Sequence, residues 1–204
     1  MDEAVAHVAA ADPALARVID VVGPCTLAPR RIKGGYFHAL ARAILYQQLA
    51  GKAAAAIHGR WVALYDGVPT PEEVLATPDE TLRSVGLSAA KAASIKDLAA
   101  KVLDGTVVLR GVHRLDDDEI VARLTQVRGI GRWTAEMFLM FQLGRPDVWP
   151  VDDYGVRKGW ALAHGRPDAL PTPKELAAAG EAYRPHRSVA AWYCWRAVDT
   201  LLPT

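Results

Sequence analysis

Cysteine is scarce in this chain, and its scarcity excludes two classes of small stabilised domain. Cys25 and Cys194 are the two cysteines among 204 residues, too few for a disulfide framework or for a metal site built from four cysteines. Free thiols persist in reducing compartments, so a cytosolic location is expected.

Long apolar runs and an excess of one charge are missing as well. No run comes near the roughly 18 apolar residues that a membrane-spanning helix needs, and 23% of the residues are charged. The acidic beginning, MDEAVAHVAA, has no positively charged flank before an apolar stretch, so we expect neither a secretory signal nor a membrane partner. Because 24 basic residues face 23 acidic ones, affinity for phosphate must come from a local cluster or from backbone amides at helix ends.

Helical periodicity is present over nearly the whole length. Hydrophobic residues make up 51% of the chain and recur three and four apart, as Phe37, Leu40 and Ile44 do. Only residues 106–115 (TVVLRGVHRL) have the alternation of a short strand. We predict an all-α fold, a two-lobed bundle of about ten helices with a cleft between the lobes. Clusters of Pro and Gly predict one lobe from residues 1–32 plus 146–204 and another from residues 33–145.

The first motif that suggests a ligand is Val127-Arg128-Gly129-Ile130-Gly131, which we name the hairpin turn. It lies between two amphipathic segments and predicts a helix–hairpin–helix over residues 116–143. The two glycines permit positive φ and close backbone approach, while Ile130 fills the angle between the helices. Outward amides of such a turn form a phosphate site. An ordinary helix–helix connection with a glycine cap explains the same residues.

Two adjacent acids, Asp152 and Asp153, stand about twenty residues further on, where a new helix is expected. A carboxylate at a helix start is usually an N-cap. With two acids, one can cap the helix while the other faces a ligand.

These motifs together resemble the helix–hairpin–helix superfamily of DNA glycosylases, and within it the 3-methyladenine branch. The resemblance extends over most of the chain and also rests on AILYQQLAGKAA (43–54), GLSAAKAASIKDLA (86–99) and RPHRSVAAWYCWR (184–196). It implies a monomeric enzyme of base excision repair whose partner is double-stranded DNA with alkylated bases. Such an enzyme is expected beside a bacterial nucleoid or in a nucleus. The hairpin by itself also occurs in many non-catalytic DNA-binding proteins.

The resemblance places the family's catalytic aspartate on Asp153. The superfamily pattern has an aliphatic residue three positions after the acid and a basic or polar one five after it, which Val156 and Lys158 satisfy. Counting from Asp152 puts Gly155 at the aliphatic position, so Asp152 is the expected neighbour or cap.

Strand-cutting branches carry a lysine two residues after the second hairpin glycine, where this chain has Trp133. Without that amine no Schiff base forms, which implies a monofunctional enzyme. An iron–sulfur cluster needs four cysteines, so no cofactor is expected for catalysis.

The resemblance also assigns aromatic residues to the base pocket. A cationic alkylated purine is received by electron-rich rings, and Trp133 and Trp195 occupy the matching positions. Tyr154 is a further candidate, and Met137 stands where some relatives have a pocket tyrosine. A tryptophan on a helix is also a common core residue. Trp192 and Tyr193 are weaker candidates.

Contacts to DNA are expected from two segments. Gln47-Gln48-Leu49, which we name the wedge loop, matches the segment that fills the gap left by a flipped base, with Gln48 as the expected wedge. A polar helix end exposed to water is the alternative. Phosphate contacts are assigned to the amides of Gly129 and Gly131 with Arg128 and Arg132, and a monovalent cation is possible on the carbonyls of Thr125, Val127 and Ile130. A wider basic rim would include Arg157, Lys158, Arg184 and Arg187.

The expected activity is therefore excision of 3-methyladenine and 7-methylguanine type purines by a monofunctional glycosylase. Two alternatives stay open. One is a non-catalytic DNA-binding module in which the acid is a structural cap, and the other is a glycosylase for hypoxanthine, ethenoadenine or uracil.

Overall fold

The computed structural model describes residues 1–30 and 33–201, and within those ranges it contains helices and turns but no strand. The chain divides into two compact units. We name them the terminal unit, residues Met1–Pro29 with Leu139–Thr204, and the central unit, residues Arg30–Phe138.

The divisions between the units differ from the expected positions. The expected division at 32/33 adjoins residues 31 and 32, which lie outside the described part of the chain. The second division falls after Phe138 rather than after residue 145. The π-helical turn Leu139–Leu143 belongs to the terminal unit, where the Phe141 ring stacks on that of Trp195.

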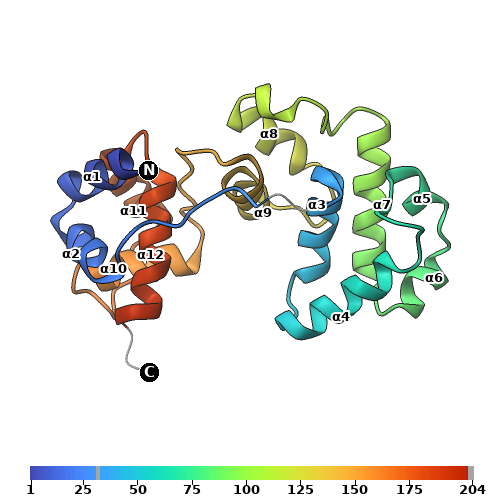
Figure 1. The fold of residues 1–204 in the computed structure, drawn as a ribbon, viewed down its shortest axis with the longest axis horizontal. Helices are drawn as coiled ribbons and strands as arrows, with labels where there is room; N and C mark the ends of the chain where they lie inside the picture. Colours follow the sequence, from blue (N-terminus) through green and yellow to red (C-terminus); the bar gives the residue numbers. More distant parts are fainter. Residues whose placement is uncertain (31–32, 202–204) are drawn as a thin grey trace. The chain divides into compact units, whose positions relative to one another are not determined.

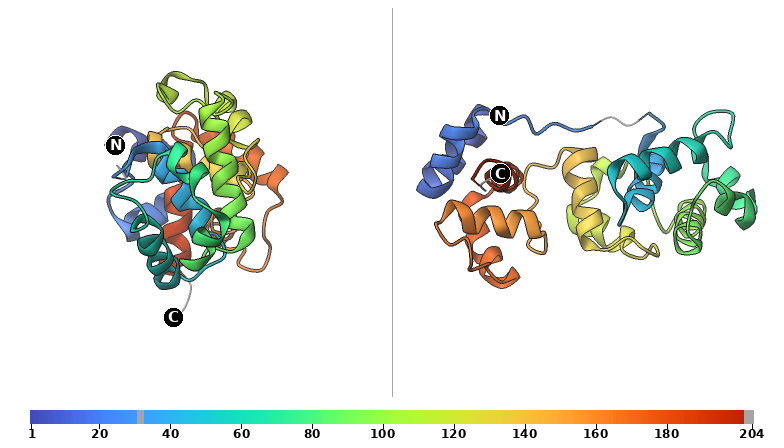
Figure 2. Two further views of the ribbon diagram at one scale, coloured as in Figure 1. Left: turned by 90° about the vertical axis from the view of Figure 1, so that its right-hand side faces the viewer. Right: turned by 90° about the horizontal axis from the view of Figure 1, so that it is seen from below.

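The terminal unit is built from helices at both ends of the chain (Figure 1). Its members are α1 (Asp2–Ala11), α2 (Pro13–Val22), α10 (Tyr154–Ala163), α11 (Pro173–Gly180) and α12 (Arg187–Leu201), with a 3-10 turn at Glu181–Tyr183. Helices α10 and α12 lie side by side (Figures 1 and 2).

Small residues allow α10 and α12 to approach closely. A Cβ atom on Gly159 would lie 1.7 Å from the Cys194 carbonyl oxygen, and one on Gly155 would lie 2.7 Å from Cδ1 of Trp195. These two glycines are four residues apart and therefore share one face of α10. Ala190 and Ala197 on α12 are fully buried. The spacing of glycines thus brings the two helix backbones into contact.

A buried polar network ties the N-terminal helices to this pair. Asp12 caps α2 by accepting the N–H of Ala14 at 2.8 Å, and its Oδ2 accepts the Tyr183 hydroxyl at 2.6 Å. His164 Nε2 lies 3.3 Å from the same oxygen. Burial acts to raise the pKa of Asp12, but the bonds from His164, Tyr183 and Ala14 outweigh it and lower the pKa to about 2. The bond to Asp12 raises the pKa of His164.

The central unit holds the remaining helices. They are α3 (Gly35–Tyr46), α4 (Gly51–Val62), α5 (Pro71–Ala76), α6 (Asp79–Ser84), α7 (Ala89–Leu103), α8 (Asp117–Leu124) and α9 (Arg132–Phe138), with a 3-10 turn at Val112–Arg114. Helix α7 packs against α3, α5 and α6 and lies between them (Figure 1). Its apolar face, with Ile95, Leu98 and Ala99 fully buried, forms the centre of this unit.

The helical prediction is confirmed, with one local difference. Twelve α-helices occupy the described residues, two of them within the first 22. Residues 106–115 form no strand; they run through a turn and the short 3-10 helix because Gly111 adopts φ +76°. No helix in the described ranges has both the length and the apolar character to cross a bilayer.

Candidate active site and hairpin turn

Asp153 stands at the start of α10 and is buried, with 8% of its surface exposed. Its Oδ1 atom accepts the N–H of Val156 at 2.8 Å and the indole N–H of Trp195 at 2.9 Å. Val156 follows three residues later in the same helix, whereas Trp195 comes from α12. Two donors on one oxygen fix the direction of the carboxyl group.

The cap of α10 is Asp153 and not Asp152. Asp152, expected to be a neighbour of the catalytic acid or the cap, is exposed and directly precedes Asp153. The reason is geometric, since the residue directly before the first helical turn is the one whose side chain reaches the N–H three positions on. Capping and a chemical role do not exclude each other, because a carboxylate has two oxygens and about four acceptor sites.

Trp195 contacts Asp153 through its edge and Phe141 through its face. The Trp195 and Phe141 rings stack with centroids 5.8 Å apart and an interplanar angle of 27°. Gly155 leaves the room that the indole occupies. Trp195 therefore positions the carboxylate, a role that its assignment to a base pocket did not include. Phe141 was missed, because an aromatic residue in an amphipathic helix carries no signal of its partner.

The other aromatic candidates differ in exposure. In the central unit Trp133, at the start of α9, is 46% exposed and Met137 is half-buried; in the terminal unit Tyr154 is 64% exposed. An exposed tryptophan is not a core residue, so the core alternative does not hold for Trp133. Tyr193 is fully buried and its hydroxyl donates to the Gly23 carbonyl at 2.9 Å, which makes it a core residue. Trp192 is half-buried, with the Arg196 guanidinium 5.6 Å from its ring.

The hairpin turn joins α8 to α9 as the sequence predicts. Val127 and Ile130 are buried, and the Ile130 N–H donates to the Val127 carbonyl at 3.0 Å. Gly129 has φ +79°, and a Cβ atom there would lie 2.8 Å from the Ser94 hydroxyl oxygen. Gly131 has neither a positive φ nor a close neighbour. The turn therefore requires glycine at position 129, as expected, but not at position 131.

Two amides of the turn are open toward solvent within the described part of the chain. The Arg128 N–H donates to Asp97 Oδ2 at 2.7 Å, but within residues 1–30 and 33–201 no acceptor receives the N–H of Gly129 or Gly131. Amides left open beside a helix start suit an anion. Arg132 pairs with Glu136 one turn later in α9, with Nε 2.9 Å from Oε1, and the Arg132 side chain is 60% exposed. Arg128 is exposed.

The wedge loop follows α3 directly. Gln48 is exposed and adopts φ +56°, which L-residues other than Asn and Asp rarely do. Gln47 is half-buried, and its Nε2 donates to the Gly129 carbonyl at 2.8 Å. Leu49 is 37% exposed. Gln47 is thus bonded to the hairpin turn, and Gln48 and Leu49 are the residues that project into solvent.

The basic side chains considered for a wider rim are bonded within the terminal unit. Arg157 donates to the Pro171 carbonyl and Lys158 to that of Pro167. Arg184 and Arg187 both pair with Asp147, at 2.8 and 2.7 Å. The Asp147 carboxylate offsets the charge of Arg184 and Arg187, which makes these two poor candidates for phosphate contacts, whereas a single carbonyl acceptor leaves the charge of Arg157 and Lys158 in place.

Thr125, Val127 and Ile130, whose carbonyls are considered for a cation, lie in and beside the hairpin turn. The Val127 carbonyl accepts the Ile130 N–H and keeps a second lone pair, and the Thr125 hydroxyl turns away to donate to the Val121 carbonyl at 2.8 Å. Neutral oxygens without a carboxylate suit a weakly bound monovalent ion better than a divalent one. In the described ranges no group of three or more His, Cys, Asp or Glu side chains forms an alternative metal site.

Helices α8 and α9, joined by a short turn with a left-handed glycine and open amides, form a helix–hairpin–helix. The family described as "HhH-GPD superfamily base excision DNA repair protein" matches residues 41–185. The chain belongs to this family.

Similar proteins cover nearly the whole chain. It is 37% identical over 193 residues to DNA-3-methyladenine glycosylase 1 of Schizosaccharomyces pombe, covering 93% of this chain and 84% of that protein. The structure of that glycosylase, solved with abasic DNA, has a TM-score of 0.82 and covers 95% of each chain. A DNA-3-methyladenine glycosidase of Bacillus halodurans is 34% identical, with a TM-score of 0.88 over 97% of this chain and 90% of that one.

Proposed function

We propose that this protein is a monofunctional DNA glycosylase of base excision repair that binds double-stranded DNA and excises alkylated purines of the 3-methyladenine and 7-methylguanine type. The observation that carries the proposal is the buried carboxylate of Asp153, held by the indole N–H of Trp195 at 2.9 Å. Family membership and the named relatives support the same activity.

The chemistry needs one well-placed carboxylate. A purine alkylated at N3 or N7 carries positive charge, so it leaves as a neutral base and needs no general acid. As the bond between C1′ and the base nitrogen breaks, the sugar develops the character of an oxocarbenium ion. Asp153 stabilises that charge, and water then adds its oxygen to C1′ while its proton passes to the carboxylate or to solvent.

Base flipping is assigned to the central unit. Gln48 and Leu49 project from the wedge loop and would fill the space that the extruded nucleotide leaves, while the open amides of Gly129 and Gly131 hold a phosphate group. The exposed ring of Trp133 is suited to receive a cationic base, a contact that contributes about 0.5–2 kcal/mol.

The absence of strand cleavage is proposed from the residue at position 133. An indole cannot form a Schiff base with the sugar, and Trp133 stands where strand-cutting branches carry lysine. Borohydride trapping on lesion-containing duplex should yield no covalent protein–DNA adduct; an adduct would show that another amine attacks C1′.

The test of the main proposal is free-base release from methylated duplex DNA by the wild-type protein and by Asp153→Asn. Asparagine keeps an oxygen for the N–H groups of Val156 and Trp195, so folding should be retained, whereas loss of the charge should lower release about a hundredfold to a thousandfold. Comparable release by both proteins would remove Asp153 from the mechanism.

A second candidate function is a non-catalytic DNA-binding module. It is favoured by the capping bond of Asp153, because that bond alone gives the acid a structural purpose. Tight binding to abasic DNA without release of any base, over a panel of alkylated, deaminated and etheno-adduct substrates, would support it. Release confined to hypoxanthine, ethenoadenine or uracil in the same panel would identify a glycosylase with a different substrate. Met137, at the position of a pocket tyrosine in some relatives, leaves this alternative open.

A further inference from the structure

One face of α7 contacts both segments that are assigned to DNA. Lys91, Ser94 and Asp97 follow one another at intervals of three, so they form a single stripe along the helix. We name these three residues the α7 brace. All of them lie in the central unit, as do the wedge loop and the hairpin turn.

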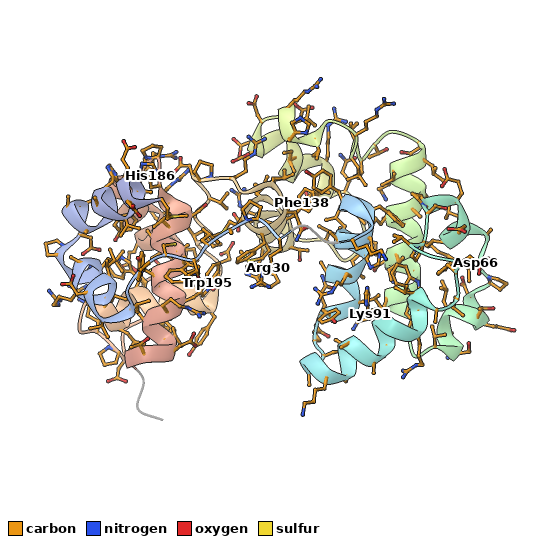
Figure 3. All side chains as sticks on the ribbon, in the orientation of Figure 1. Arg30, Asp66, Lys91, Phe138, His186 and Trp195 are labelled. Carbon is orange, nitrogen blue, oxygen red and sulfur yellow. The ribbon has the colours of Figure 1, made fainter. Side chains whose placement is uncertain are left out.

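Lys91 fixes the wedge loop. Lys91 is labelled in Figure 3. Its ammonium donates to the carbonyls of Leu45 at 2.7 Å and Gln47 at 2.8 Å, where α3 ends. The last carbonyls of a helix have no partner within it, and a cation at this end is favoured by the helix dipole. Burial lowers the pKa of Lys91. Two bonds from one side chain therefore fix the direction of the backbone after α3, and with it the position of Gln48.

Asp97 and Ser94 fix the hairpin turn. Asp97 Oδ2 accepts the Arg128 N–H at 2.7 Å, and the Lys101 ammonium lies 2.6 Å from the other oxygen. Burial acts to raise the pKa of Asp97, but the bonds from Arg128 and Lys101 outweigh it and lower the pKa. The Ser94 hydroxyl fills the space that Gly129 leaves open.

A fourth contact closes the arrangement. The Gln47 side chain donates to the Gly129 carbonyl at 2.8 Å, so the two segments are joined directly as well as through α7. The contacts run from Lys91 to the wedge loop, from there to the hairpin turn, and back to α7 through Asp97. A closed ring of this kind resists relative displacement better than separate contacts, because no member can move without breaking a bond.

We propose that Lys91, Ser94 and Asp97 are positioning residues that hold the wedge loop and the hairpin turn at a fixed separation. A phosphate gripped by the turn then sets the place at which Gln48 enters the duplex, and no rearrangement precedes insertion. The inference rests on the proposed function, since it assigns the brace to the same base-flipping step.

The experiment compares binding to an undamaged duplex with binding to a duplex that carries a tetrahydrofuran abasic analogue, with 2-aminopurine fluorescence beside the analogue as the report of insertion. Lys91→Met should lower the preference for the abasic duplex about tenfold, while affinity for undamaged DNA stays within about twofold. The matched control is Lys96→Met on the same helix, because Lys96 pairs with Asp79 and contacts neither segment. The control should keep the wild-type preference.

Conservative variants separate positioning from folding. Lys91→Arg can still donate to two carbonyls and should restore the preference. Asp97→Ala should weaken binding to both duplexes about tenfold, since it frees the hairpin turn, whereas Asp97→Asn keeps an acceptor for Arg128 and should retain most of the affinity. If Lys91→Met fails to fold, the Asp97 pair still decides the matter.

Neither measurement requires base release, so the two proposals fail separately. A wild-type protein that inserts into abasic DNA but releases no base would contradict the glycosylase proposal and leave the brace in place. An unchanged preference in folded Lys91→Met, or equal affinities for the two Asp97 variants, would overturn the brace. A wild-type protein without preference for the abasic duplex would overturn it too.

Discussion

The terminal and central units present their candidate functional groups in opposite ways. In the terminal unit the group is one buried side chain, Asp153, bonded to Val156 and Trp195 and surrounded by tightly packed helices. In the central unit the groups are backbone amides and exposed side chains on two short loops. Side chains of α7 form hydrogen bonds to both loops. A reacting carboxylate gains from fixed surroundings, whereas contacts to a phosphate backbone need exposed donors.

The difference appears again in how each unit uses glycine. In the terminal unit Gly155 and Gly159 make room for another helix, so their lack of a side chain is used for packing. In the central unit Gly129 supplies a left-handed turn. The two uses predict different consequences for the same substitution.

The largest effect is expected from Gly159→Ala. The new Cβ would lie 1.7 Å from the Cys194 carbonyl, so α10 and α12 must separate, and the free energy of unfolding should fall by about 3 kcal/mol or more. Gly59→Ala is the control, because Gly59 lies within α4 with open space around it and should gain about 0.5–1 kcal/mol. Denaturant unfolding measures both. Similar stabilities for the two variants would mean that the terminal unit tolerates wider helix spacing.

The next effect tests whether Trp195 acts through Asp153. Trp195→Phe removes the indole N–H and keeps a ring against Phe141, so base release should fall about tenfold to a hundredfold while the fold is retained. Trp192→Phe, on the same helix, should retain wild-type rates. Single-turnover release with excess enzyme gives the rate; equal rates for the two variants would leave Trp195 without a positioning role.

A smaller effect separates the two glycines of the hairpin turn. Gly129→Ala places a side chain at φ +79° and against the Ser94 hydroxyl, a strain of about 1–2 kcal/mol, so DNA affinity should weaken about tenfold. Gly131→Ala meets neither obstacle and should bind within about twofold of wild type. Fluorescence anisotropy with undamaged duplex at one fixed salt concentration compares them. A reversed order would contradict the geometry of the turn.

The smallest effect concerns the polar network of the terminal unit. The bond to Asp12 raises the pKa of His164, so its stabilisation is complete below about 6.5 and is lost as the pH rises through the raised value. Asp12, with its pKa lowered to about 2, contributes above its ordinary value of 3.8 and loses that contribution as the pH falls toward 2. Between pH 6 and pH 9 the wild-type protein should therefore lose stability relative to His164→Gln, a comparison that cancels the opposite contribution of His38 and His58, whose pKa burial lowers. Denaturant unfolding of both proteins across this pH range measures the difference. An identical pH dependence of the free energy of unfolding in the two proteins would show that His164 does not contribute to it.

Much of this organisation follows from local sequence. Spacings of three and four residues predict the helices, and Gly129 with buried Ile130 predicts the turn between α8 and α9. The adjacent acids Asp152 and Asp153 predict a helix start, because acids favour the N-cap position, but only the structure shows that Asp153 is the cap. Residues 106–115, the one segment whose alternation resembles a strand, form none, since alternation over a short segment does not compensate for a glycine in the left-handed conformation.

The sequence by itself determined the helices, the hairpin turn and the acid at the start of α10, because periodicity, glycine and capping act between near neighbours. Only the tertiary structure decided which residues hold these groups in place. Trp195 meets Asp153 across 42 positions, and Asp97 meets Arg128 across 31. The periodicity of a sequence predicts which face of a helix is buried. Which distant residues contact that face depends on how the helices pack, and a single sequence contains no pattern for that.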